Sequence, residues 1–231
     1  VFNLVPSVTN MFGKSVLPCA AQSWAKGQKE AVQKQLQSVL FLTALIALPA
    51  AGGLFCLSDS ILMLLYPGQE TACRIAAESL RSLLPGMVFL CFTMPLFSIF
   101  QGIGRADLPV KYMLPCIAIK LLGNILFLQI PACSLLGAGL STSLCYALLF
   151  GMTLFSLCRM LGMSLRGLKP ILPLCYAATM SITTAYLFRN LTRAMPLPVM
   201  LLCSVGSAVV MYGVVLLLLE KTANRLREGL C

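Results

Sequence analysis

The sequence predicts an all-α fold, a polytopic bundle of about seven transmembrane helices, and three observations support this prediction. Hydrophobic residues make up 59% of the 231 residues and charged residues 10%, whereas a soluble domain is about 25% charged. Apolar runs long enough to cross a bilayer follow one another with short connections. Lys and Arg collect in alternate connections, as in multi-span membrane proteins. The predicted spans cover about 1–22, 38–66, 77–102, 109–131, 136–158, 170–188 and 197–219.

Polar residues form a stripe along the first span. Asn3, Ser7, Asn10 and Lys14 lie within about 60° of one another around a helix. Because such a face is costly against lipid, we expect it to point into the bundle or into a cavity that binds substrate. Lys14 is therefore a candidate cavity cation. Alternatively, its position nearer the cytoplasmic end of the span lets it reach the headgroups.

The segment 25–38 predicts a separate helix on the membrane surface. Ala25, Val32, Leu36 and Val39 fall on one stripe, and lysines, glutamines and a glutamate cover the rest. We expect this helix to lie along the cytoplasmic face, with its lysines near anionic headgroups. A solvated linker helix is the alternative.

A lysine lies at the centre of the apolar run from Val110 to Ile130. As one helix this run spans about 31 Å, so Lys120 is far from both membrane surfaces. Asn124 follows one turn later on the same face. A charge at this depth requires a wet cavity, a buried partner or a ligand. Two interpretations stay open: Lys120 is a structural residue bonded to carbonyls of neighbouring helices, or it lines a transport cavity together with Asn124.

The fifth span begins with a series of small residues. Gly137, Gly139, Ser141 and Ser143 form small-x-x-x-small pairs, which allow two membrane helices to approach closely. We therefore expect this span to pack tightly against a neighbour.

The distribution of basic residues predicts the orientation. Eleven lie in one set of alternate connections and at most four in the other, so the first set and the C-terminus are predicted to be cytoplasmic. The first set comprises Lys26, Lys29, Lys34, Arg105, Lys111, Arg159, Arg166, Lys169, Lys221, Arg225 and Arg227.

Composition argues against catalysis, metal binding and nucleic-acid binding. Histidine, the commonest general base and metal ligand, is absent, and almost all of the seven carboxylates fall at predicted span ends or loops. Most of the eleven cysteines lie inside apolar runs without a C-x-x-C pair, so they are interpreted as small apolar fillers. The basic residues are scattered between spans rather than clustered. We expect no catalytic residues, no metal and no cofactor.

Short motifs in a fixed order cover nearly the whole chain. They are Val16-Leu17-Pro18 followed by Ala25-Lys26-Gly27-Gln28-Lys29, then Leu48–Leu54, Leu64–Gly68, Gln101–Lys111, Ile119-Lys120-Leu121 with Asn124, and Leu136–Thr142. This order resembles the polysaccharide and lipid-linked-oligosaccharide flippases of the multidrug/oligosaccharidyl-lipid/polysaccharide superfamily. It is most similar to the C-terminal half of the stage V sporulation protein B branch, and more distantly to lipid II flippases.

The resemblance implies a two-lobed transporter of 14 helices, of which this chain supplies helices eight to fourteen. Residues 1–160 would form the C-terminal lobe and residues 161–231 two additional transmembrane helices with a cytoplasmic tail. A span-like pattern begins at once at Val1, so we expect a fragment that lacks the N-terminal lobe. Its expected partners are the bilayer of the cytoplasmic membrane, an anionic lipid-linked sugar and that lobe.

The predicted function is to flip a lipid-diphosphate-linked saccharide by alternating access, with Lys14 and Lys120 holding the anionic head group. A multidrug/cation antiporter of the same superfamily is one alternative, but it would need carboxylates at mid-membrane. A membrane scaffold or a membrane enzyme is another. The enzyme would need a carboxylate pair or a histidine near the cytoplasmic surface.

Overall fold

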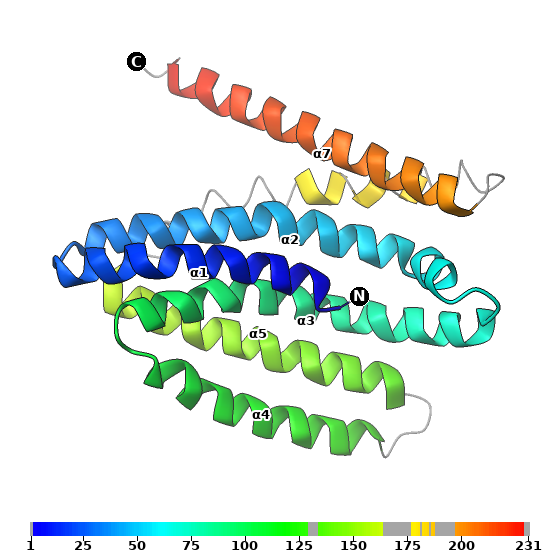
Figure 1. Cartoon of the computed structure of the whole chain (residues 1–231), viewed down its shortest axis with the longest axis horizontal. Coiled ribbons are helices and arrows are strands. Elements are labelled where there is room, and N and C mark those ends of the chain that lie inside the picture. The colour runs from blue at the N-terminus through cyan, green and yellow to red at the C-terminus, as the bar shows by residue number, and fades with distance from the viewer. Residues whose placement is uncertain are drawn as a thin grey trace. The chain divides into compact units, whose positions relative to one another are not determined.

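The computed structural model describes residues 2–128, 134–163, 177–180, 182–184, 186–187 and 197–228, nearly all of them in helices and the rest in short connections. The long helices are α1 (Leu4–Ala25), α2 (Lys29–Leu65), α3 (Glu70–Gly102), α4 (Asp107–Leu128), α5 (Ser134–Leu161) and α7 (Leu197–Glu228) (Figure 1). The predicted all-helical transmembrane fold is confirmed. Most of the predicted span 170–188 lies outside the described residues.

Within the described part of the chain, four helices are long and apolar enough to cross a membrane: α2, α3, α4 and α5. Helix α1 is not among them, because the polar residues along it lower its hydropathy. Helix α7 contains a shorter apolar stretch, Val199–Val215.

Glycine allows the turns that follow α1 and α3. Gly27 has a φ of 71° and follows α1, and Gly104 has a φ of 76° and follows α3. Both angles lie in the left-handed region, where a side chain is disfavoured, so each glycine ends a helix and lets the chain reverse.

The structure differs from the predicted separate helix 25–38. The chain turns at Gly27, and from Lys29 it runs on without a break into α2, a single helix of 37 residues. No glycine or proline interrupts it before Pro49, so nothing separates the amphipathic part from the apolar part. The predicted stripe is nevertheless apolar and buried, with Val32, Leu36 and Val39 fully inaccessible.

The chain divides into two compact units. The first contains Val1–Ala47 and Glu78–Lys169, and the second contains Leu48–Ala77 and Pro170–Cys231. Helices α2 and α3 each contribute to both units. All six candidate residues from the sequence lie in the first unit. The predicted division of the chain near residue 160 stays a prediction.

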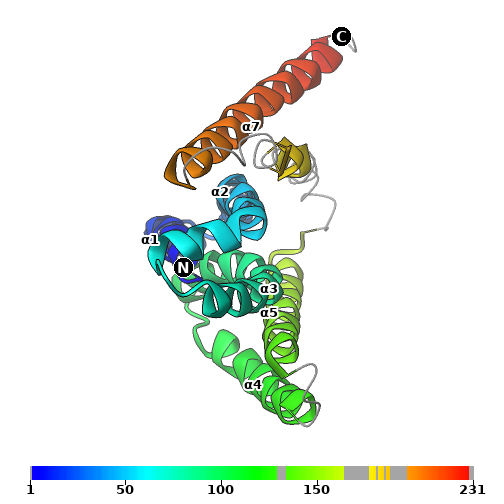
Figure 2. The same ribbon diagram turned by 90° about the vertical axis from the view of Figure 1, so that its right-hand side faces the viewer.

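Helix α3 forms the core of the first unit, where Met87, Leu96, Ile99 and Phe100 are fully buried. Helices α3 and α5 lie between α1 and α4, as both views show (Figures 1 and 2). Helix α2 contacts α1, where Gln35 Nε2 of α2 donates a hydrogen bond to Ser23 Oγ of α1 at 3.1 Å.

Small residues bring α5 against α3, as the sequence predicts. A Cβ on Gly139 would collide with Ser82, and a Cβ on Gly86 would lie 2.9 Å from the Cα of Ser143. The Ser143 hydroxyl donates to the Ser82 carbonyl at 3.0 Å and accepts from the Gly86 N–H at 3.1 Å. In a regular α-helix the Gly86 N–H would bond the Ser82 carbonyl directly. Here the Ser143 hydroxyl of α5 lies between these two groups and bonds both, beside Pro85 of α3.

Described residues of the second unit form two small apolar clusters. Cys56, Leu57 and Leu201 form one, and Leu62, Cys73 and Ala77 form the other. Six described cysteines are buried, in agreement with the prediction that they fill apolar space: Cys56, Cys73, Cys91, Cys116, Cys145 and Cys158.

Candidate functional site

The polar stripe of α1 faces away from the core of the first unit. Asn3, Ser7 and Lys14 are exposed and Asn10 is half-buried. The Ser7 hydroxyl donates to the Asn3 carbonyl at 2.7 Å, within the helix itself. Among the described residues, Lys14 has neither an ion pair nor a hydrogen bond.

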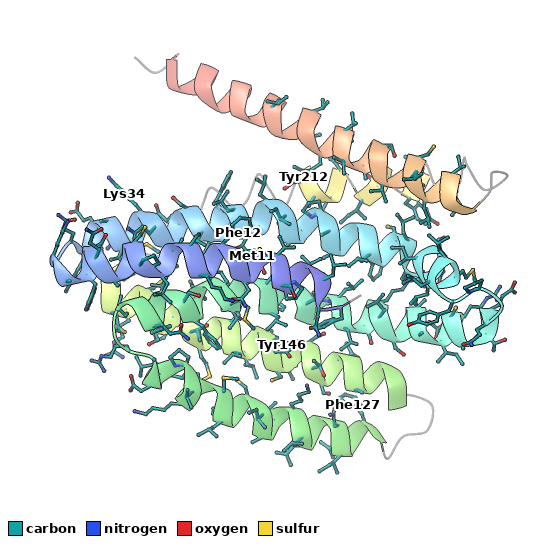
Figure 3. The ribbon with its side chains drawn as sticks, in the orientation of Figure 1. Met11, Phe12, Lys34, Phe127, Tyr146 and Tyr212 are labelled. Atoms are coloured by element: carbon teal, nitrogen blue, oxygen red, sulfur yellow. The ribbon has the colours of Figure 1, made fainter. Side chains whose placement is uncertain are left out.

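The rotation of α1 follows from its contact with α3. Gly13 is buried, and a Cβ placed on it would lie 2.6 Å from Ser98 Oγ and 3.0 Å from Pro95 Cα. This close approach turns Val5 and Thr9 inward as well. The stripe therefore points outward, where it shares the surface with apolar side chains such as Met11, which is 68% exposed (Figure 3).

Lys120 and Asn124 lie at a different place, where α4 packs along α5. Lys120 is half-buried, and its Nζ lies 5.9 Å from the centre of the Tyr146 ring. This distance is within the range of a cation–π interaction. One turn further along α4, the Asn124 side-chain oxygen accepts a hydrogen bond from the Ser141 hydroxyl.

The same face of α4 continues towards its N-terminus. The Tyr112 hydroxyl donates to Ser156 Oγ at 2.8 Å, and Cys116 packs against Cys145 and Leu149 of α5. We call this line of contacts the α4–α5 seam. It comprises Tyr112, Cys116, Lys120 and Asn124 of α4 and Ser141, Cys145, Tyr146, Leu149 and Ser156 of α5.

The sequence reasoning missed Tyr146 and the role of Ser141. A signal for both was present, because α4 and α5 are antiparallel and joined by a short connection. In such a hairpin, a residue further from the connection on one helix faces a residue further from it on the other. The two contacts follow this order: Asn124 meets Ser141 nearer the connection, and Lys120 meets Tyr146 further from it.

The structure does not bring the two candidate groups together within this unit. Asn3, Ser7, Asn10 and Lys14 lie on α1, whereas Lys120 and Asn124 lie on α4, and α3 and α5 separate these helices (Figures 1 and 2). The described residues contain no group of three or more His, Cys, Asp or Glu that could hold a metal ion.

The helical architecture and the long apolar helices define a multi-pass membrane protein. A model of the MatE family matches residues 1–126, more than half of the chain. The chain therefore belongs to the MatE family of membrane transporters.

Two examples of similar proteins follow. One is the uncharacterized membrane protein MJ1068 of Methanocaldococcus jannaschii, 27% identical over 138 residues, which are 60% of this chain and 26% of the archaeal protein. The other is a solved structure of the lipid II flippase MurJ in an inward closed conformation, with a TM-score of 0.71 and 18% identity. That match covers 96% of this chain and 46% of the MurJ chain, and it shows a shared fold. The chain thus spans about half the length of MurJ and a quarter of the archaeal protein.

Proposed function

We propose that this chain is half of a transporter that flips a lipid-diphosphate-linked saccharide, a precursor of polysaccharide or peptidoglycan, across the cytoplasmic membrane. Membership of the MatE family and the fold shared with a lipid II flippase support this function. The proposal extends to the finer predictions, a stage V sporulation protein B-like transporter with a cytoplasmic C-terminus. The observation that carries it is the outward polar face of α1, with the charge of Lys14 unopposed by any described residue.

The α1 face suits an anionic head group. Lys14 supplies the positive charge, while Asn3, Ser7 and Asn10 supply neutral hydrogen-bonding groups on the same side of the helix. The lipid tails stay in the bilayer while the lobes rock to change access. In the proposal Lys120 and Asn124 form a second site for the anionic head group, at the α4–α5 seam.

A multidrug/cation antiporter is less compatible with these helices. Such a transporter needs carboxylates that face its cavity, whereas α1 contains no Asp or Glu. Helix α4 contains only Asp107, in its first turn, where its carboxylate pairs with Lys111 Nζ at 3.2 Å.

The test compares Lys14→Gln with Lys34→Gln in the full-length protein, reconstituted in vesicles with a fluorescent lipid-diphosphate sugar. Lys34 is also exposed but lies on α2, outside the polar face (Figure 3). A charge-assisted hydrogen bond contributes roughly 1.5–3 kcal/mol against about 1 for a neutral one, so Lys14→Gln should reduce transport about tenfold. Lys34→Gln should change it little.

Transport is normalised to the amount of folded protein. Equal normalised rates for Lys14→Gln and wild type would show that the α1 face does not bind the head group. Export of a cationic dye, with no movement of the lipid-linked sugar, would favour the antiporter instead.

A further inference from the structure

A groove of about 530 Å³ runs between α4 and α5, and Lys120 does not line it. Leu122 and Leu126 of α4 form one wall, and Leu140 and Leu144 of α5 form the other. These four side chains are between 54% and 64% exposed. The groove is therefore open to the surroundings of the helix pair along its rim.

The bottom of the groove is made of two small residues. A Cβ on Gly123 would lie 2.9 Å from the Cβ of Ser141, so the two helices are close together here. Ser141 is only 3% exposed, and its hydroxyl contacts both Asn124 and the Ala138 carbonyl. The one polar side chain that lines the groove is thus already hydrogen-bonded, and the lining offers no charge.

Both walls belong to helices that are long and apolar enough to span a membrane. Water has no partners in such an apolar groove, and an empty one would leave its lining without contacts. A polar or charged ligand would lose its hydration without compensation. A hydrocarbon chain needs no hydrogen-bond partners and loses no favourable hydration in the groove. It would contact the protein on three sides there, whereas a lipid chain beside a flat helix face contacts it on one.

We infer that the α4–α5 groove is a binding site for one acyl chain of a membrane phospholipid. This inference does not depend on the transported substrate, because the groove excludes the polar head group that the proposed function requires. It assigns Gly123 and Ser141 a role in shaping the site: larger residues at these positions would fill it.

The test uses tryptophan fluorescence, for which the chain is well suited because it contains a single tryptophan, Trp24. In a Trp24→Phe background, Leu122→Trp places an indole at the groove. Leu121→Trp is the matched control, since Leu121 is 58% exposed against 61% for Leu122 but does not line the groove. The two positions are adjacent, so they differ in depth by only about 1.5 Å.

Each variant of the full chain is reconstituted in phosphatidylcholine vesicles with increasing fractions of phosphatidylcholine brominated on its acyl chains. A bound chain should quench Leu122→Trp half-maximally at a mole fraction about twofold or more below that for Leu121→Trp. Identical curves would overturn the inference, because both indoles would then report only exchanging bulk lipid. Weaker quenching at Leu122→Trp would also overturn it, since a protein segment or a second copy would be covering the groove.

A second pair guards against a folding defect in α4. Leu144→Trp lines the groove from α5, and Leu148→Trp lies one turn further along the same helix, outside the groove. The same difference between quenching curves is expected, and its absence from this pair too would reject the site.

Discussion

The ammonium group of Lys120 on α4 lies 5.9 Å from the centre of the Tyr146 ring on α5, midway along two antiparallel helices. A lysine placed at the centre of an apolar span needs a partner, and here the partner is an aromatic face. The contact does not neutralise the charge, since a ring carries no formal charge of its own. Lys120 is therefore stabilised by its neighbour and still able to attract an anion.

We predict that Lys120 and Tyr146 are energetically coupled. Tyr146→Leu removes the ring and should lower the thermal stability of the protein, whereas Tyr146→Phe keeps the ring and should be close to wild type. In a double-mutant cycle of Lys120→Gln and Tyr146→Leu, measured by thermal unfolding in detergent, the coupling should be about 0.5–2 kcal/mol. Strictly additive effects would show that the two side chains do not interact.

Transport by Lys120 variants separates the two interpretations of this residue. If Lys120 holds a diphosphate, Lys120→Gln should lower transport per folded molecule about tenfold, and Lys120→Arg should retain part of it. If Lys120 is only structural, expression and thermal stability fall while normalised transport hardly changes. The assay is again lipid-linked sugar movement in vesicles, run with the full-length protein.

The Ser143 bridge should contribute to the packing of α5 on α3. Ser143→Ala removes a hydroxyl that bonds the Ser82 carbonyl and the Gly86 N–H, and the expected loss is about 0.6–1.5 kcal/mol. Ser15→Ala is the control, because the exposed Ser15 hydroxyl bonds the Phe12 carbonyl within its own helix. If both variants unfold at the same temperature, the bridge has no net stabilising effect.

Two glycines of α5 should respond in opposite directions to substitution by alanine. At Gly139 a Cβ collides with Ser82 of α3, so Gly139→Ala should destabilise the protein by about 1–3 kcal/mol. At Gly151 a Cβ meets nothing within 4 Å, so Gly151→Ala should be neutral or stabilising by up to about 1 kcal/mol. Thermal unfolding measures both, and equal shifts would contradict the close α3–α5 contact.

The distribution of basic residues predicts which side of the membrane each turn occupies. Gln28 lies just before α2 and Gln69 just before α3, and both are exposed. In a cysteine-free background, a cysteine at Gln28 should react with an impermeant reagent only from the cytoplasm, and one at Gln69 only from outside. A cysteine at Leu165, which lies outside the described residues, should behave like Gln28. Labelling of Gln69 from the cytoplasm would reverse the predicted orientation.

The sequence by itself determined the fold class and which residues share a helix face, whereas α2 and α3 begin at Lys29 and Glu70, several residues before the predicted spans. These features are local: the length of an apolar run indicates a span, and helical periodicity places Asn3, Ser7, Asn10 and Lys14 on one side of α1. The small residues of α5 also predicted a close contact, although they did not identify α3 as the neighbour.

Only the tertiary structure decided what those faces meet. Gly13 approaches α3 closely and so turns the α1 stripe away from the core of the first unit, and the pairing of α4 with α5 places Tyr146 beside Lys120. The continuation of α2 from Lys29 to Leu65 likewise emerged from the structure. The physical reason is that a helix's own periodicity leaves its rotation and its register against neighbours undefined. Contacts between small residues far apart in the chain set both.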